Sequence, residues 1–558
     1  VGLVLERTPH PNADRLGFCR VDLGEGEPLG IVCGAPNVAG GQRVAVATVG
    51  TRLPGGLEIG RAKIRGVASE GMICSERELG LSDEHEGIWV LPAEAPLGRP
   101  VAEAFGGPDW VIVVDNKAVT HRPDLWGHRG LARELAALLD RPLREADLSL
   151  PPTGPGPAFP VQLQSPHCRR FVALPIDGVQ AGPSPDWLRL LLLAAGQRPI
   201  DCLVDASNFV MLDLGQPNHL FDRRAVEGGI VVRQAHAGER LVTLDGVERR
   251  LEPADLLICN AAQAVALAGI MGGEASKVAG DSRSLLLEVA NFDAATIRRS
   301  SSRLGLRTEA SSRFEKSLDP ALPLEAAAQL VRLLADLQPS LQLPCPPTDI
   351  GDWQRPRLGI RLRPARVREL LGLELDDERI ADILVRLRFD VRRDDGGEWW
   401  VTVPSDRATK DVALEEDLIE EVGRFQGYDA IPEQAILAPL APALPDRRQA
   451  LITAAQDFLA GAPAFHEVLS YSFVDEHLAE RLGLDAHVHS RVVNAVAAGL
   501  SRLRRDVAPS LLGHLARNLR LDNDLRLFEV GKGSRPEWLD ERGKPGEVEQ
   551  VALAWARA

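Results

Sequence analysis

The chain has 558 residues, 45% of them apolar and 26% charged, which is ordinary for folded proteins, and its length predicts about three to five domains. Its net charge of −15 argues against a protein that coats nucleic acid indiscriminately, because such a protein needs a broadly basic surface. Any nucleic-acid partner must therefore be bound by local basic patches.

Cysteine usage and hydropathy indicate a cytoplasmic location. Seven cysteines are scattered without a CxxC pair, which predicts neither a zinc site nor a disulfide framework and favours a reducing compartment. No charged-then-apolar leader opens the chain, and the longest apolar stretch, residues 256–273, is interrupted by Asn and Gln. Neither secretion nor membrane insertion is indicated. Strand-like runs lie at both ends, so both ends look truncated.

Short β-patterned runs separated by Gly and Pro turns occupy residues 1–105. This pattern is typical of a small closed barrel, and the OB-fold is the leading candidate. The stretch RAKIRG places Arg61, Lys63 and Arg65 near a turn, where such charges suit contact with RNA phosphates. Surface residues without a partner are an equal alternative.

Residues 106–184 predict a strand at DWVIVVD, a polar turn, a helix beginning near Gly127, and a Pro-rich linker, LSLPPTGPGPAFP, that marks a domain boundary. The pattern in residues 185–345 is mixed, with helices at 185–196 and 323–337 and strands near 229–238 and 284–292. This predicts an α/β or α+β domain that is long enough to contain a pocket.

Residues 352–432 predict two helices, near Pro364 and Asp377, then a hairpin and a third helix, an order that resembles a winged helix. The third helix, DVALEEDLIEEVGRFQ from Asp411, carries six carboxylates within eleven residues. Apolar residues recur in it at near-helical intervals, so one face is expected to be buried. Taken alone, the charge run is best interpreted as a solvated helix face.

Residues 440–558 begin with a helix at DRRQALITAAQDFLAG and continue with strand-like runs at EVLSYSFVD and LRLFEVGKG. The stretch GKGSR lacks the G-x-x-x-x-G-K-[ST] pattern of a phosphate loop, and no helix is apparent after it. This part of the chain therefore shows no nucleotide-binding motif.

Two stretches of the chain resemble the β-subunit of bacterial phenylalanine-tRNA ligase. Residues 197–222 combine an Arg-Pro turn, a D-x-[ST]-N-[YF]-V-M-L segment and a Q-P-x-H-x-F-D turn. LGLRTEASSRFEKSLDP, residues 304–320, is similar to the closing segment of that family's editing domain. HPNADRL, KIRGVASEGMICS and the acidic helix also follow in the family's order, so the resemblance covers nearly all of the chain.

The resemblance implies a multidomain α+β architecture. Its parts are an OB-fold tRNA-binding domain at 1–105, a connecting α/β segment at 106–184, a B3/B4-type editing domain at 185–345, a B5-type winged-helix-like domain at 352–432, and a partial class II synthetase-like domain at 440–558. In the last, LSRLRRDVAPSLL resembles the arginine-bearing strand and loop of class II synthetases, in a catalytically silent copy.

The resemblance also implies partners and an activity. An α-subunit would use ATP and attach phenylalanine to tRNA within an α2β2 tetramer, whereas this chain would bind tRNA and hydrolyse mischarged tyrosyl-tRNA. A hydrolytic site is needed because a hydrophobic pocket selects only weakly against an isostere that carries one extra hydroxyl.

For the editing pocket, the resemblance implies six residues: Ser207, Asn208, His219, Gly269, Glu288 and Ala290. Glu288 can accept a hydrogen bond from the tyrosine phenol, which phenylalanine lacks. Gly269 and Ala290 would leave room for the ring, and His219 and Asn208 could position the water and the ester carbonyl. Ser207 replaces the family's threonine and keeps its hydroxyl. Taken alone, His219 is more often a structural turn residue, and Glu288 a strand-end carboxylate that faces solvent.

The acidic helix resembles the part of the family's subunit that surrounds a magnesium ion where the two subunits meet. The acids that the resemblance assigns to this ion are Asp411, Asp417, Glu420 and Glu421, and carboxylate oxygens are the ligands that magnesium prefers. Two other interpretations stay open. One is a stand-alone nucleic-acid-binding protein built from an OB-fold and a winged helix, and the other is a structural subunit whose editing pocket has decayed.

Overall fold

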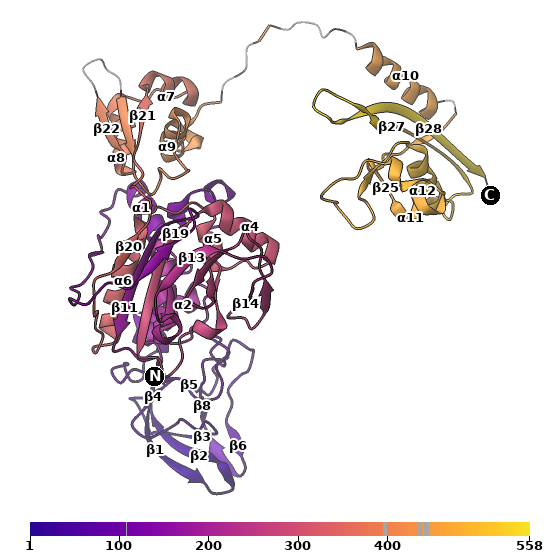
Figure 1. Cartoon of the computed structure of the whole chain (residues 1–558). Helices are drawn as coiled ribbons and strands as arrows, with labels where there is room; N and C mark the ends of the chain where they lie inside the picture. The colour runs from indigo at the N-terminus through magenta and orange to yellow at the C-terminus, as the bar shows by residue number, and fades with distance from the viewer. Residues whose placement is uncertain are drawn as a thin grey trace. The chain divides into compact units, whose positions relative to one another are not determined.

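The computed structural model describes residues 1–107, 109–393, 399–433, 435, 438–439, 444, 446–461 and 463–557. It divides into two compact units, residues 1–433 and 434–558, and each is described by itself. Figure 1 labels the helices and strands along the chain. Among the described residues, no helix combines the length and the apolar character that crossing a membrane requires.

Strands dominate the first hundred residues, as predicted. One sheet has the order β3-β2-β1-β4-β9, and two two-stranded sheets, β5-β8 and β6-β7, accompany it. Their bounds are β1 (Gly2–His10), β2 (Ala13–Asp22), β3 (Leu29–Cys33), β4 (Arg43–Val44), β5 (Val46–Thr48), β6 (Ala62–Ile64), β7 (Val67–Ser69), β8 (Gly71–Ile73) and β9 (Val90–Leu91). Alternate residues of β2, Cys19 and Val21, are fully buried and pack with Ile31 and Val44, which is the period-2 pattern of a strand with one buried face.

The apolar segment at 109–116 does not form the predicted strand. Trp110, Ile112 and Val113 are 89%, 82% and 84% exposed, and no strand among the described residues pairs with this segment. Strand propensity reflects packing against neighbours rather than an intrinsic backbone preference, so an apolar run without a neighbouring strand stays irregular. The helix expected near Gly127 is confirmed as α1 (His128–Leu138).

Two sheets and a layer of helices form the next domain. The sheets have the orders β10-β13-β16-β17-β18 and β12-β19-β11-β20. The strands are β10 (Val161–Leu163), β11 (Cys168–Asp177), β12 (His219–Asp222), β13 (Ile230–Gln234), β16 (Leu256–Cys259), β17 (Ala264–Leu267), β18 (Met271–Gly272), β19 (Ser284–Phe292) and β20 (Thr348–Ile350), with a side hairpin of β14 (Arg240–Val242) and β15 (Glu248–Arg250). The helices are α2 (Asp186–Ala194), α3 (Cys202–Leu214), α4 (Ala294–Leu304), α5 (Glu309–Phe314) and α6 (Leu322–Leu337).

The boundary expected at residue 185 falls inside this domain. Strand β11 precedes it and pairs with β19 from Cys168 to Asp177. The Pro-rich linker before β11 is also held to the domain, because the backbone N–H of Gly154 donates to the carbonyl of Leu343 at 2.8 Å. Composition marked the linker, but it could not show that the next strand lies at the centre of the sheet.

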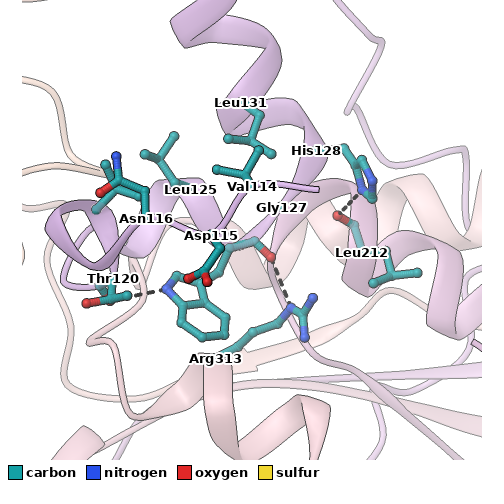
Figure 2. A pocket seen from close by; sticks show the side chains of 12 residues that line it. Val114, Asp115, Asn116, Thr120, Leu125, Gly127, His128, Leu131, Leu212 and Arg313 are labelled. Carbon is teal, nitrogen blue, oxygen red and sulfur yellow. Dashed lines mark hydrogen bonds between the residues drawn. The ribbon is translucent and has the colours of Figure 1, made fainter. Parts of the chain in front are cut away.

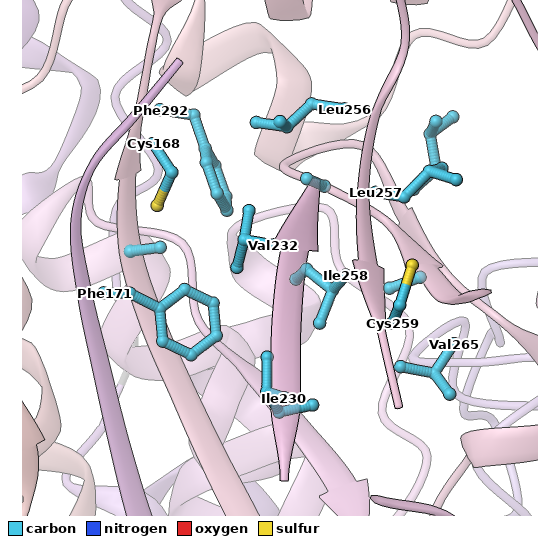
Figure 3. Close-up of a cluster of buried hydrophobic side chains, with 14 of the residues drawn as sticks. Cys168, Phe171, Ile230, Val232, Leu256, Leu257, Ile258, Cys259, Val265 and Phe292 are labelled. Atoms are coloured by element: carbon cyan, nitrogen blue, oxygen red, sulfur yellow. The ribbon is translucent and has the colours of Figure 1, made fainter. Parts of the chain in front are cut away.

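The four-stranded sheet is buried on both faces. In β19, Leu285, Leu287 and Val289 pack toward α3 and α6, whereas Leu286 and Ala290 face the five-stranded sheet. Figure 3 shows Phe171 and Phe292 of the four-stranded sheet turned toward Val232 of β13. Because successive side chains of a strand alternate between faces, Glu288 belongs to the face between the two sheets.

The following domain confirms the predicted order of helix, helix, hairpin and helix. Its elements are β21 (Leu358–Leu362), α7 (Pro364–Leu371), α8 (Asp377–Arg386), β22 (Asp390–Arg393), β23 (Trp399–Val403) and α9 (Glu415–Gln426). Strand β21 was not predicted, and it completes a sheet of order β21-β23-β22. Helix α9 begins at Glu415 rather than Asp411, because Leu414 is extended and the Asp417 carboxylate accepts the backbone N–H groups of Ala413 and Leu414 at 2.7 and 2.8 Å.

The second unit is built around a long hairpin. Its elements are α10 (Arg447–Ala460), β24 (His466–Glu467), β25 (Phe473–Val474), α11 (Glu476–Arg481), β26 (Arg502–Leu503), α12 (Ala508–Asn518), β27 (Asp524–Leu539) and β28 (Pro545–Arg557). Leu511 and Leu515 of α12 pack on Leu525 and Leu527 of β27. The helix predicted at 446–461 and the strand predicted at 525–533 are confirmed, whereas the run at 467–475 is divided between β24 and β25.

Candidate active site

Glu288 and His219 lie opposite each other on neighbouring strands. Strands β12 and β19 are antiparallel, and their register pairs His219 with Glu288. Directly opposed residues share one face of the sheet, with Cβ atoms about 4.5 to 5.5 Å apart. Both side chains therefore face the layer between the two sheets, so Glu288 is not the solvent-facing strand-end carboxylate that its local sequence suggests.

These two residues line a cavity of about 60 Å³. Other residues that line it are Asn218, Gly269, Met271, Gly272 and Phe314. Most small-molecule sites hold about 300 Å³ or more, so the empty cavity is too small for an aromatic ring. A ligand of that size enters only if side chains at the cavity shift.

Burial changes the ionisation of both groups. It raises the pKa of Glu288 to about 8 and lowers the pKa of His219 to about 4. The Nε2 atom of His219 is buried and has no hydrogen-bond partner within the described part of the chain. At neutral pH, the glutamic acid is therefore mostly protonated and the imidazole is neutral. Strongly shifted pKa values in a cavity are a mark of functional sites.

Two glycines shape the wall of this cavity. A Cβ atom on Gly272 would lie 2.6 Å from Cε1 of His219, so the imidazole keeps its place only because residue 272 has no side chain. Gly269 has a φ of +67°, and its Cβ would lie 2.9 to 3.0 Å from Phe292, Ile297 and Phe314. In the empty cavity, Gly269 thus makes room for the wall itself rather than for a substrate ring.

The remaining predicted residues differ in their distance from the cavity. Ser207 is linked to it through Asn218, because the Ser207 hydroxyl donates to Oδ1 of Asn218 at 2.7 Å and Nδ2 of Asn218 donates to the Ser207 carbonyl at 3.1 Å. Ala290 is fully buried on the same face of β19 as Glu288. Asn208 is half-buried on α3, and neither Asn208 nor Ala290 is among the described residues that line the cavity.

Sequence reasoning did not assign Asn218 to the site. It occupies the variable position of the Q-P-x-H-x-F-D turn, where it departs from the family pattern, and its neighbour His219 carried the motif. The signal that could have found it is local: a polar side chain directly before a strand residue that faces the cavity. Its pairing with Ser207, eleven positions earlier in the chain, is a tertiary contact that the spacing alone does not reveal.

The four acids assigned to magnesium do not form a ligand set. Among the described residues, no group of three or more His, Cys, Asp or Glu side chains is placed to hold a metal ion. The Asp411 carboxylate contacts Arg407 and lies 2.9 Å from Nε2 of His121. Asp417 caps its own helix, and Glu420 is exposed.

Glu421 is the most firmly engaged of these acids. Its carboxylate lies 2.9 Å from Arg407, and Nε of Arg424 donates to it at 2.8 Å. Burial opposes ionisation, but the hydrogen bonds and charges of Arg424 and Arg407 outweigh it and hold the pKa of Glu421 well below its usual range. Arg424 also contacts Glu134, which accepts from Arg122 at 2.9 Å. Arginines neutralise Asp411 and Glu421, and Asp417 is engaged by backbone N–H groups, so in the arrangement described the four acids do not converge on a magnesium ion.

The basic hairpin predicted to contact RNA is exposed. Its turn residues, Arg65 and Gly66, both have positive φ, 46° and 93°. Arg61 lies 3.5 Å from Glu70, whereas Lys63 and Arg65 form no ion pair within the described residues. The hairpin is thus free to present two positive charges to solvent.

The HPNADRL motif holds this hairpin in place. Nδ2 of Asn12 donates to the carbonyl of Arg65 at 2.9 Å, and Nε2 of the buried His10 lies 3.1 Å from the carbonyl of Ile64. Two motifs that are separated by some fifty residues in the sequence therefore form one structural feature.

A larger cavity, of about 320 Å³, lies where η3 (Pro123–Trp126) and α1 meet α3. Nε of Arg313 donates to the carbonyl of Trp126 at 3.1 Å. Figure 2 shows His128 beside the carbonyl of Leu212, at 3.0 Å. These bonds fix the connecting segment onto the domain that contains Glu288. None of the predicted site residues lines this cavity.

Comparisons with known proteins agree with this architecture. Family models match residues 1–100 (putative tRNA binding domain), 167–339 (B3/4 domain), 360–428 (tRNA synthetase B5 domain) and 431–558 (phenylalanyl tRNA synthetase beta chain CLM domain). A solved N-terminal fragment of the phenylalanyl-tRNA synthetase beta-subunit from Pyrococcus horikoshii is 17% identical, with coverage of 55% of this chain and 85% of that fragment. Its TM-score of 0.30 is too low to support an argument.

Sequence similarity to phenylalanine-tRNA ligase beta subunits extends over almost the whole chain. The phenylalanine-tRNA ligase beta subunit of Nitratidesulfovibrio vulgaris is 41% identical over 546 residues, which is 95% of this chain and 67% of that protein. The corresponding subunit of Moorella thermoacetica is 41% identical over 564 residues, or 98% of this chain and 68% of that protein. The chain therefore spans about two thirds of the length of these relatives. With this identity over nearly its full length, the chain belongs to the family of phenylalanine-tRNA ligase beta subunits.

Proposed function

We propose that this chain is a subunit of a phenylalanine-tRNA ligase, binds tRNA, and hydrolyses mischarged tyrosyl-tRNA in the cavity between β12 and β18. A partner α-subunit would carry out the ATP-dependent attachment of phenylalanine. The observation that carries the hydrolytic part is the pairing of Glu288 with His219 in an otherwise apolar layer. Lys63 and Arg65 on the β6-β7 hairpin are the proposed contacts to RNA phosphates.

Glu288 would recognise the phenol. A protonated carboxyl group has one oxygen that accepts a hydrogen bond and one hydroxyl that donates, and a carboxylate accepts only. A tyrosine phenol can donate to either form, whereas phenylalanine leaves the buried carboxyl unsatisfied. An unsatisfied buried polar group costs about 1 to 3 kcal/mol, so recognition works on both sides of the pKa of about 8.

His219 would act on the ester. With a pKa of about 4, the imidazole is neutral at pH 7 but a weak base, so holding a water molecule or the ester carbonyl is its main contribution. The water oxygen bonds to the carbonyl carbon, the bond from that carbon to the ribose oxygen breaks, and a water proton passes to the ribose oxygen. The products are free tyrosine and tRNA.

The cavity must widen for this reaction. Met271 lines it, is half-buried and is unbranched, and methionine adapts readily to new packing. Displacement of Met271 is therefore the change that we expect when a tyrosyl ring enters. Asn218, held by Ser207, would fix the opposite edge near His219.

A decayed editing pocket is the main competing interpretation. A subunit with only a structural role would gain stability from an apolar residue at position 288, because a buried carboxyl without a partner destabilises the fold. The same holds for the unpartnered Nε2 of His219. Retention of both groups in the core supports a working site.

The carboxy-terminal unit is proposed to be catalytically silent and to contact the α-subunit. Arg504, in the stretch that resembles the class II arginine-bearing strand, is 4% exposed and lies 2.8 Å from Glu529. Because this ion pair occupies the guanidinium group, Arg504 is not free to bind a nucleotide phosphate. A stand-alone nucleic-acid-binding protein would have no use for such a unit or for the Glu288 cavity.

The test is deacylation by the assembled ligase. Glu288→Ala should slow hydrolysis of tyrosyl-tRNA about tenfold to a hundredfold, because it leaves the buried phenol without a partner, at a cost of about 1 to 3 kcal/mol, and should lower the preference for tyrosyl- over phenylalanyl-tRNA. His219→Ala should slow hydrolysis of both. Phenylalanine charging serves as the folding control. Wild-type deacylation in both variants would place editing elsewhere.

A further inference from the structure

Helix α4 presents arginines on its solvent-facing side. Ala294, Ile297, Ser300 and Ser301 are buried, whereas Arg298, Arg299, Ser302 and Arg303 are exposed. The helix contains no acidic residue. In a chain with a net charge of −15, this face is a local concentration of positive charge.

Two of these arginines lack a carboxylate partner. Arg303 contacts Asp255, and Arg307, just after the helix, lies 3.0 Å from Glu315. By contrast, neither Arg298 nor Arg299 forms an ion pair with any residue that the structure describes. The only side-chain bond found for Arg299 in that part of the chain is from its Nε to a backbone carbonyl of the same helix, at 3.2 Å.

The arginine face lies close to the candidate active site. Ile297, the residue before Arg298, packs at the cavity wall, since a Cβ atom on Gly269 would lie 3.0 Å from it. The neighbouring helix α5 contributes Ala310 and Phe314 to the cavity lining. An α-helix with its side chains is about 10 to 12 Å across, so the two arginines stand about one helix diameter from the wall.

We propose that Arg298 and Arg299 bind phosphates at the 3′ end of the aminoacylated RNA while its terminal ester occupies the cavity. The inference rests on the proposed hydrolytic function and adds the surface that guides the substrate. Guanidinium groups bind phosphate oxygens in a bidentate manner, and single-stranded RNA is usually tracked by a positive groove beside the site of chemistry. An ordinary solvated helix face would make no such contribution.

The experiment compares a substrate that has phosphates with one that has none. The double variant Arg298→Glu with Arg299→Glu is assayed in the assembled ligase on tyrosyl-tRNA and on the tyrosyl ester of adenosine, which has the same ester and ring but no phosphate. We expect kcat/KM for tyrosyl-tRNA to fall at least tenfold, mainly through KM, and to become less dependent on salt, since each phosphate contact adds about 0.7 to the salt slope. Hydrolysis of the adenosine ester should be unchanged.

Arg283→Glu is the matched control. Arg283 is also exposed, but it directly precedes β19, whereas α4 follows the other end of that strand; this variant should keep both activities. An equal change, or no change, in the two activities of the double variant would overturn the phosphate contact. If the wild-type ligase hydrolyses neither substrate, the proposed function fails first, and this inference fails with it.

Discussion

Glu288 places a carboxyl group in an apolar layer, so the stability of the folded chain should depend on pH. Its pKa is raised from 4.5 to about 8 by burial. Between these values, the unfolded chain has released the proton and the folded chain still holds it, so the folded state loses stability as pH rises through that window. Above about pH 8, both states are ionised and the loss is complete.

The first prediction follows from this loss of stability with rising pH. Glu288→Gln removes the titration, so its melting temperature relative to wild type should rise from pH 5.5 to pH 8.5. Glu420→Gln, at an exposed position, should show no such trend. The measurement is thermal unfolding of each variant at both pH values. A difference between Glu288→Gln and wild type that is constant with pH would mean that the Glu288 carboxyl titrates normally.

The sequence predicted part of this residue-scale arrangement. The sequence supplied the role of Glu288 only through the resemblance and, taken alone, suggested a strand-end carboxylate that faces solvent, whereas Glu288 lies on the same face as Leu286 and Ala290. It could not show that this face lies between two sheets, because strands far away in the sequence build the second one. The shifts of the pKa values of Glu288 and His219 come from that burial, so the sequence could not predict them either.

At the scale of elements, buried ion pairs anchor α9. Arg407 and Arg424 both contact Glu421, and removal of one partner from a buried ion pair typically costs about 3 to 5 kcal/mol. The sequence predicted the acidic helix and its apolar face. It did not predict these ion pairs or the contacts of Arg424 with Glu134 and of Asp411 with His121, because the fold brings Glu134 and His121 to the helix.

The second prediction compares neighbouring glutamates of α9. Glu421→Gln should lower the melting temperature of the chain markedly, whereas Glu420→Gln should keep the free energy of unfolding within about 0.5 kcal/mol of wild type, as is usual for an exposed position. Addition of a chelator should change neither. Thermal unfolding with and without EDTA measures this. A chelator-dependent melting temperature in the wild-type chain would instead support a metal in this region.

The segment at 109–116 illustrates a different limit of sequence analysis. Its run of apolar residues has strong strand propensity, yet Trp110 and Val113 are almost fully exposed. A strand is completed by backbone hydrogen bonds to a neighbour, and a sequence pattern does not say whether that neighbour is present. Helix α1, whose hydrogen bonds are internal, was predicted correctly from the same stretch.

At the scale of the whole molecule, the carboxy-terminal unit has an apolar row that its own core does not cover. Val551, Leu553 and Trp555 of β28 are 46%, 52% and 58% exposed, whereas the alternating Ala552 and Ala554 pack on the core. Exposed apolar surfaces of this kind mark protein contacts. Under the proposed function, we expect the α-subunit to contact this row.

The third prediction tests that assignment. Leu553→Asp should weaken assembly with the α-subunit and reduce charging of phenylalanine, with little effect on the folding of the isolated chain. Glu541→Gln, in the exposed turn between β27 and β28, is the control. Analytical ultracentrifugation of the mixed subunits gives the answer. Unchanged assembly with Leu553→Asp would remove this row from the interface.

The most direct measurement of the central claim is a structure of the assembled ligase with a non-hydrolysable tyrosyl analogue of the tRNA 3′ end. The account predicts that the phenol oxygen lies about 2.5 to 3.0 Å from a carboxyl oxygen of Glu288, with the amide that replaces the ester beside Nε2 of His219 and Met271 displaced. An analogue bound at another site, with this cavity unchanged and empty, would contradict the account.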